Sequence, residues 1–145
     1  MRIITLLLLL TACTQVHSNN AIQLFGVNVM LNESCQIEVS SSSKAKAVVQ
    51  DFTFEPGGEC RIVTHANTSI PITYFINGSY ILFIEKNHQE RDSCYSEHTA
   101  IAIDKNQHLL TTPIIKKSGS CFQSQELNAF EYFSQKLKPK KNVAQ

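Results

Sequence analysis

The residues best suited to chemistry lie in the second half of the chain, where His88 and Asp92 precede the adjacent pair Glu97 and His98. With His65, they are the candidates for an acid/base or metal site, because carboxylate and imidazole groups serve both uses. The sequence contains none of the spacings His-x-x-x-His, His-Glu-x-x-His or Gly-x-Ser-x-Gly that mark zinc or serine hydrolases. Neighbours on a strand also point to opposite faces, which separates Glu97 from His98. We therefore predict no catalytic residue, no metal and no cofactor, and a small hydrolase that uses Glu97 and His98 is the third hypothesis.

The cysteines predict a disulfide framework. Four of the five lie in the body of the chain, at Cys35, Cys60, Cys94 and Cys121, and none is in a Cys-x-x-Cys pair that would favour zinc. An even number of cysteines in an exported domain is typical of disulfides, and three pairings are open. The spacing favours Cys35 with Cys60 and Cys94 with Cys121, because each pair closes a loop of strand, turn and strand that ends on Gly-x-Cys.

The first residues of the chain predict export. Arg2 is followed by a mostly apolar run, Ile3 to Leu10, which is shorter than the roughly 20 residues that a membrane span needs. We expect residues 1–12 to be removed as a signal peptide. The junction Leu10-Thr11-Ala12-Cys13 resembles the lipobox of bacterial lipoproteins, in which the cysteine becomes the lipidated first residue of the mature protein.

This resemblance implies a location as well as an anchor. It implies that Cys13 carries a lipid in a Gram-negative cell envelope, so that the membrane is one partner. The family associates an aspartate after the cysteine with retention in the inner membrane, and here Thr14 takes that place. We therefore expect the outer membrane, facing the periplasm. Residues 13–20 are short and polar and are predicted to form a tether.

A second interpretation of the same segment is an ordinary secretory signal, residues 1–18, cut after Ser18. Three Asn-x-Ser/Thr sequons favour it, because Asn32, Asn67 and Asn77 would then be glycosylation sites in a eukaryotic secretory pathway. The protein would be a secreted eukaryotic or viral glycoprotein that acts as a ligand or decoy.

Composition predicts one folded domain without a nucleic-acid partner. The chain has 145 residues, of which 43% are hydrophobic, with 13 Lys and Arg against 12 Asp and Glu. This balanced charge provides no field that would favour nucleic acid. We assign residues 21–138 to a single globular domain and residues 139–145 to a basic flexible tail.

Hydrophobic alternation predicts a sheet of about seven or eight strands. The Asn77-Gly78 pair between two apolar runs is the strongest local signal, and it predicts a two-residue hairpin turn. Lys86 to Ser93 is predicted to be a charged loop, and Asp104 to Gln107 a turn. The predicted strands are Ile22–Leu31, Cys35–Val39, Ala47–Phe54, Arg61–Thr64, Ile72–Ile76, Tyr80–Ile84, Ala100–Ile103 and Leu109–Ile115.

One helix is predicted, from Ser124 to Leu137, because Ser124 can cap its first turn and apolar residues recur along one stripe. Pro139 would end it. The fold class is therefore α+β and mostly β, an antiparallel sheet or sandwich with one C-terminal helix and two disulfides.

The apolar hairpin is the candidate binding surface. Its aromatic residues are Tyr74, Phe75, Tyr80 and Phe83. They form either core or a face that awaits a partner. From the anchor and the missing catalytic signature, we predict an envelope protein that acts by contact with a protein partner, of the inhibitor, immunity or accessory-subunit type.

Overall fold

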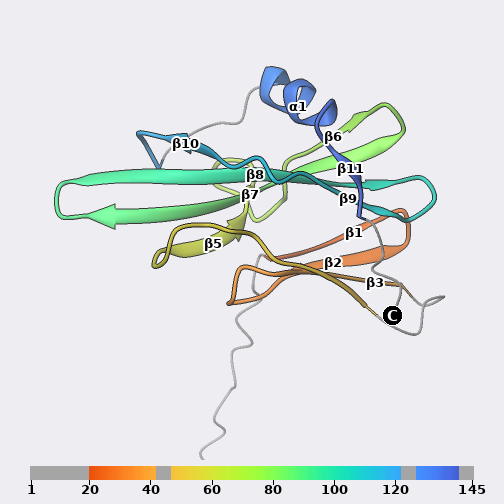
Figure 1. Ribbon diagram of the computed structural model, residues 1–145, viewed down its shortest axis with the longest axis horizontal. Helices are drawn as coiled ribbons and strands as arrows, with labels where there is room; N and C mark the ends of the chain where they lie inside the picture. The colour runs from red at the N-terminus through yellow and green to blue at the C-terminus, as the bar shows by residue number, and fades with distance from the viewer. Residues whose placement is uncertain (1–19, 42–46, 122–126, 141–145) are drawn as a thin grey trace, which may run out of the picture.

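Two antiparallel sheets and one short helix make up the structure, a computed structural model that describes residues 20–41, 47–121 and 127–140. Figure 1 shows three layers, with the helix on one side of the larger sheet and the smaller sheet on the other. The predicted class, mostly β with one C-terminal helix and two disulfides, is confirmed. The strands number eleven among the described residues, more than predicted, because one predicted strand is divided and two short strands were not foreseen.

The smaller sheet has the order β1-β2-β3-β4 and is built from consecutive hairpins. Its strands are β1 (Ala21–Leu24), β2 (Val27–Leu31), β3 (Ile37–Ser41) and β4 (Val48–Gln50). The single strand predicted over Ile22–Leu31 is wrong. Phe25 and Gly26 both have positive φ, 47° and 78°, and reverse the chain in a two-residue turn that pairs Leu24 with Val27.

The larger sheet is organised around one long hairpin. Its strands are β5 (Glu59–Ile62), β6 (Thr73–Ile76), β7 (Ser79–Glu90), β8 (Ser93–Asp104), β9 (Leu109–Thr111), β10 (Lys116–Ser118) and β11 (Lys138–Pro139). The order is β11-β9-β8-β7-β5, with β6 also on β7 and β10 also on β8. The predicted turn at Asn77-Gly78 is confirmed, since both residues have positive φ, 52° and 79°, and Ile76 pairs with Ser79.

The predicted charged loop over Lys86 to Ser93 is wrong. Strand β7 continues to Glu90 and β8 begins at Ser93, so both strands are 12 residues long. The polar residues remain in the sheet because they face suitable partners on the other strand, as in the pair Lys86 and Glu97. Figure 1 shows this end of the hairpin reaching beyond both neighbouring layers.

Each face of the β7–β8 hairpin covers its own apolar core. Leu82, Ile84 and Ile101 face the smaller sheet and are buried with Val29 and Ile37. The opposite face packs on the helix. There, three aromatic side chains, Phe83, Phe130 and Phe133, are almost completely buried. Burying each such side chain contributes roughly 1.5–3 kcal/mol.

The helix α1 (Leu127–Ser134) is shorter than predicted. The helix ends at Ser134. Leu137, which lies just beyond the helix, donates from its amide to the carbonyl of Phe133 in the last turn. The predicted start at Ser124 lies outside the described residues. The predicted tail is also partly wrong, because Pro139 belongs to β11 and the amide of Lys140 donates to the carbonyl of Leu109 at 3.1 Å. Proline is tolerated there because β11 is an edge strand.

The two disulfides join Cys35 to Cys60 and Cys94 to Cys121, the pairing that the spacing favoured. The first links the segment before β3 to β5 and so ties the two sheets together. The second ties β8 to the segment that follows β10. Residues 1–19, which include Cys13, both expected cleavage sites and most of the expected tether, lie outside the described residues. Of the helices in the described part, none is long and apolar enough to cross a membrane.

Candidate functional site

Three side chains with metal-ligating atoms meet on the face of β7–β8 that is turned toward the smaller sheet. One ligand atom from each of Glu55, His88 and Glu97 lies within 4.8 Å of the other two. His88 and Glu97 come from facing strands, and His88 Nε2 is 3.0 Å from Glu97 Oε2. Both side chains are almost completely buried, at 7% and 3% exposure. The His88 ring also stacks on Tyr95, with 4.6 Å between the ring centroids.

Glu55 reaches this position from the segment between β4 and β5, and hydrogen bonds hold it there. Its amide donates to Glu97 Oε2 at 2.8 Å, and its carbonyl accepts from Lys86 Nζ at 2.7 Å. Its carboxylate accepts from the Tyr95 hydroxyl at 3.0 Å and is paired with Lys117 on β10. We use the name Glu55 network for the residues that these bonds connect: Glu55, Lys86, His88, Tyr95, Glu97 and Lys117.

Three members of the Glu55 network, Glu55, Tyr95 and Lys117, are held in their ordinary ionisation states. The hydrogen bond from Lys117, followed by that from Tyr95, lowers the pKa of Glu55. The same bonds to Glu55 raise the pKa of Lys117 and of Tyr95. An acid/base catalyst works best with a pKa near the operating pH, and these three shifts run away from neutrality. Each carboxylate oxygen of Glu55 already accepts a hydrogen bond, from Lys117 or from Tyr95, so a metal ion at Glu55 would compete with these two donors. The network is therefore best understood as a polar clamp that holds the segment around Glu55 on the sheet.

The predicted pair of Glu97 and His98 is divided between the two faces of β8, as the strand alternation implied. His98 lies under the helix, where its ring is 6.0 Å from Phe83 and 6.1 Å from Phe133 between centroids. Burial, and next the charge of Lys116, lower the pKa of His98. Its Nδ1 is buried without a hydrogen-bond partner among the described residues. His98 therefore belongs to the core under the helix and not to a site with Glu97.

The other candidates are scattered, and further members of the cluster were missed. His65 and Asp92 are exposed, His65 in the connection between β5 and β6 and Asp92 at the tip of the β7–β8 hairpin. Sequence reasoning overlooked Glu55, Tyr95 and Lys117. Glu55 is 42 residues from Glu97 and lies outside any strand, so no spacing rule connects them. The only available signal was that His88 and Tyr95 become partners once the charged segment is recognised as strand.

The predicted aromatic surface divides between two sides of the sheet. Phe83 has no exposed surface, and Tyr74 contacts Phe130 on the helix side at 4.4 Å between centroids. Phe75 points the other way and is 58% exposed. It packs on Tyr80 at 5.1 Å and on Phe25, from the β1–β2 turn, at 6.2 Å. We call Phe25, Phe75 and Tyr80 the aromatic platform.

The platform lies beside an open strand edge. Strand β6 pairs with β7 on one side, and among the described residues no strand pairs with its other side. Because Ile76 and Ser79 close the two-residue turn, the ladder alternation directs the backbone N–H and C=O of Phe75 away from β7. This edge therefore offers both backbone hydrogen-bonding groups and an exposed ring.

The three sequon asparagines differ in their surroundings. Asn32 is half-buried, and its Nδ2 donates to Gln36 Oε1 at 2.9 Å and to Glu38 Oε1 at 3.2 Å. Its Nδ2 is therefore engaged, which disfavours a glycan at this position. Asn67 and Asn77 are exposed, and both occupy turn positions with positive φ, 61° and 52°. Their side chains can carry a glycan without disturbing the core, and glycosylation there stays a prediction.

Comparison with family models, with curated proteins and with solved structures finds no match to this chain.

Proposed function

We propose that this protein is exported, anchored by a lipid on Cys13 to the periplasmic face of the outer membrane, and active through contact with a protein partner. The two disulfides are typical of an oxidising compartment outside the cytoplasm. The lipobox resemblance at Leu10-Thr11-Ala12-Cys13 supports the anchor. Inhibitors, immunity proteins and accessory subunits of envelope assemblies are the types of partner-binding protein that fit this description.

The observation that carries the proposed contact is the exposure of Phe75 beside the open edge of β6. The Phe75 side chain is 58% exposed and lies in a cluster with Phe25 and Tyr80. A cluster of apolar residues at the surface is typical of an interaction site, whereas single exposed apolar residues are common on any surface. Here the ring is supported from behind by Phe25 and Tyr80, so little conformational entropy would be lost on binding. An extended segment of a partner can add to β6 and place an apolar side chain on the aromatic platform.

The chemistry of the Glu55 network supports contact over catalysis. Glu55 is hydrogen-bonded to Tyr95 and Lys117. These bonds lower the pKa of Glu55 and raise the pKa of Tyr95 and of Lys117, so they favour the charged carboxylate, the neutral phenol and the charged ammonium. Three pockets in the described part of the chain, one between the two sheets, one at Glu90–Ser93 and one beside Phe52 and Pro113, are lined by residues other than Glu55, His88 and Glu97. A substrate site is more often a concave pocket that holds its reactive groups.

The contact is tested by comparing two variants that place a charge on an exposed edge strand. Phe75→Asp alters the aromatic platform. Val49→Asp alters β4 of the other sheet, where the Val49 side chain is 41% exposed. Wild-type protein and both variants are affinity-purified from the native host, and proteins that accompany them are quantified. We expect one envelope protein to accompany wild type and Val49→Asp and to be absent with Phe75→Asp. That envelope protein, once purified, should bind the purified wild-type chain directly. A partner set that is the same for all three proteins would contradict the proposed surface.

The location is tested independently by the mass and N-terminal residue of the mature protein. A start at Cys13 with added acyl mass, and loss of membrane fractionation in Cys13→Ala, is the expected result. A soluble protein that begins near Asn19 and carries sugar mass would overturn the anchor. It would favour the secreted glycoprotein, with Asn67 and Asn77 as the exposed attachment sites.

A further inference from the structure

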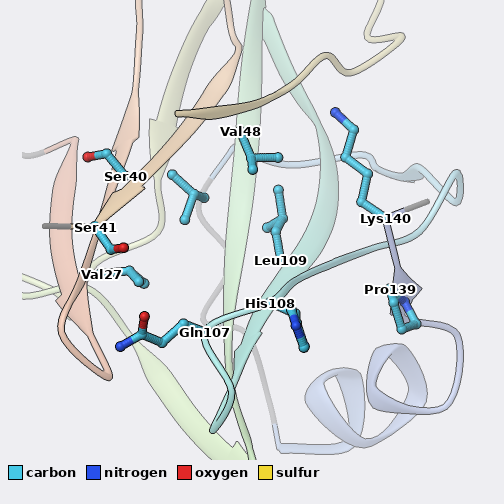
Figure 2. Close-up of a pocket in the computed structure, with 10 residues that line it drawn as sticks. Val27, Ser40, Ser41, Val48, Gln107, His108, Leu109, Pro139 and Lys140 are labelled. Atoms are coloured by element: carbon cyan, nitrogen blue, oxygen red, sulfur yellow. The ribbon is translucent and has the colours of Figure 1, made fainter. Parts of the chain in front are cut away.

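A pocket opens between the two sheets, on the border of the core that they share. It has a volume of about 340 Å³ and is lined by residues from β2, β3 and β4 of the smaller sheet and from the segment around β9 and β11 of the larger one. Figure 2 shows side chains from both sheets around this space, with Val27 on one side and Lys140 on the other. The volume lies within the range typical of small-molecule sites.

The interior of the pocket is apolar and consists of short side chains. Val27, Val39, Val48 and Leu109 line it, and all but Val48 are buried. No Phe or Tyr is among the lining residues in the described part of the chain, in contrast to the core under the helix, which is filled by Phe83 and its neighbours. Strands β4 and β9, which contribute Val48 and Leu109 to the lining, are each three residues long.

The rim of the pocket is polar, and its ionisable groups are basic. Lys140 and His108 line it, and no carboxylate is found among the described lining residues. Lys140 Nζ donates to the carbonyl of Val49, and His108 Nδ1 is 3.1 Å from Asp104 Oδ2. Both basic groups are therefore held at the mouth by neighbours, and neither is turned into the apolar interior. Because Asp104 offsets the charge of His108, Lys140 is the lining cation that an anionic group at the mouth would meet.

We propose that this pocket binds a small amphipathic anion, with its apolar body between the sheets and its acidic head at Lys140. If a methylene group occupies about the volume of a water molecule, roughly 30 Å³, the pocket takes a chain of about ten carbons. A free fatty acid and a single acyl chain of an anionic lysolipid share this chemistry. The site is separate from the proposed aromatic platform, since none of Phe25, Phe75 and Tyr80 lines it.

The test uses decanoate as the probe, with the purified full chain and binding followed by calorimetry and by shifts of backbone amide resonances. Val48→Phe fills the pocket, and Val49→Phe is its matched control because the neighbouring side chain points to the other face of β4. We expect decanoate to bind wild type, with its Kd raised by about tenfold or more in Val48→Phe and within about twofold of wild type in Val49→Phe. Lys140→Gln should raise the Kd by about threefold, the effect of one partly exposed charge.

The head-group preference is tested by decylamine, which has the same chain and the opposite charge. We expect it to bind at least about tenfold more weakly than decanoate. This comparison, like Lys140→Gln, needs no change to the apolar interior, so it stands even if Val48→Phe fails to fold. Decanoyl lysophosphatidylglycerol, titrated in parallel, distinguishes a lipid source from a free acid by which of the two binds more tightly. No decanoate binding up to its solubility limit, or binding that is equal in Val48→Phe and Val49→Phe, would overturn the proposal.

Discussion

Substitution of Gly58 by alanine is expected to destabilise this fold far more than the same change at Gly57. Both glycines have positive φ, 81° at Gly57 and 74° at Gly58, and both precede β5. A Cβ atom at Gly57 would meet nothing within 4 Å. A Cβ atom at Gly58 would lie 2.2 Å from the backbone oxygen of Asn87 on β7. The two variants therefore share their backbone cost and differ in one steric clash.

The expected magnitudes follow from these two costs. Placing a non-glycine residue in the left-handed region costs about 1–2 kcal/mol, and this applies to both variants. The clash at Gly58 is with backbone, which cannot rotate away, so β5 must separate from β7 beside the first ladder pair, Glu59 with Asn87. Overpacking of this kind costs typically about 1–3 kcal/mol. We expect a total loss of about 2–5 kcal/mol for Gly58→Ala and about 1–2 kcal/mol for Gly57→Ala.

Equilibrium unfolding in urea measures both variants under the same conditions. The chain has four tyrosines and no tryptophan, so circular dichroism and tyrosine fluorescence are the suitable signals. The effect of losing a glycine on the unfolded chain is the same for both variants and cancels in their difference. If both variants lose the same free energy of unfolding, or if Gly57→Ala is the less stable, the close approach of β5 to β7 is wrong.

Three further predictions concern stability. Replacing Cys35 and Cys60 together by alanine removes the covalent link between the sheets. For a separation of 25 residues, the chain-entropy model predicts that the free energy of unfolding in urea falls by about 3.5 kcal/mol. A loss below about 1 kcal/mol would contradict a stabilising role of this disulfide. Because burial lowers the pKa of His98, the unfolded protein takes up the proton of His98 at a higher pH than the folded protein does. The contribution of His98 to the free energy of unfolding is therefore complete above about pH 6.5 and decreases as the pH falls below it. The melting temperature of His98→Gln should therefore fall less between about pH 7.5 and pH 5.5 than that of wild type, and an equal fall would refute the burial effect. Phe83→Ala should cost about 3–5 kcal/mol because its ring is completely buried against the helix, whereas Phe75→Ala should cost less than about 1 kcal/mol, and similar losses for the two would show that Phe75 is part of the core.

Local signals in the sequence predicted the elements whose conformation depends on local chemistry. The Asn77-Gly78 turn was predictable because both residues tolerate positive φ, and the runs beside it are apolar enough to form central strands. The same reasoning failed at Phe25-Gly26, where a bulky residue takes positive φ in the first turn position. Phe25 accepts this strain in a turn where its ring contacts Phe75 and Tyr80, and these contacts cannot be seen from the neighbouring residues.

The elements that were missed depend on partners far away in the chain. Lys86 and His88 look like loop residues until Glu97 and Tyr95 are placed opposite them on β8. Strand β11 exists only because β9, about 28 residues earlier, offers it an edge, and such non-local pairings are not encoded in a local pattern.

The candidate site was predictable only in part, for the same reason. Glu97 was identified as a residue suited to chemistry, and its separation from His98 followed from the alternation of a strand. Its actual neighbours, His88 and Glu55, depend on strand register and on the path of an irregular segment, respectively. The sequence assigned the four aromatic residues to one hairpin, but their division into a buried Phe83 and an exposed Phe75 required knowing where the helix packs.

The central claim, that this protein works by contact through the aromatic platform, is tested most directly by photocrosslinking in the native host. A photoreactive phenylalanine analogue replaces Phe75 in one variant and Val49 in the other, two exposed positions on edge strands of different sheets. Our account predicts a discrete crosslinked complex with an envelope protein from position 75 and none from position 49. The same products from both positions, or no crosslink from position 75 in cells that express the protein at its natural level, would contradict it.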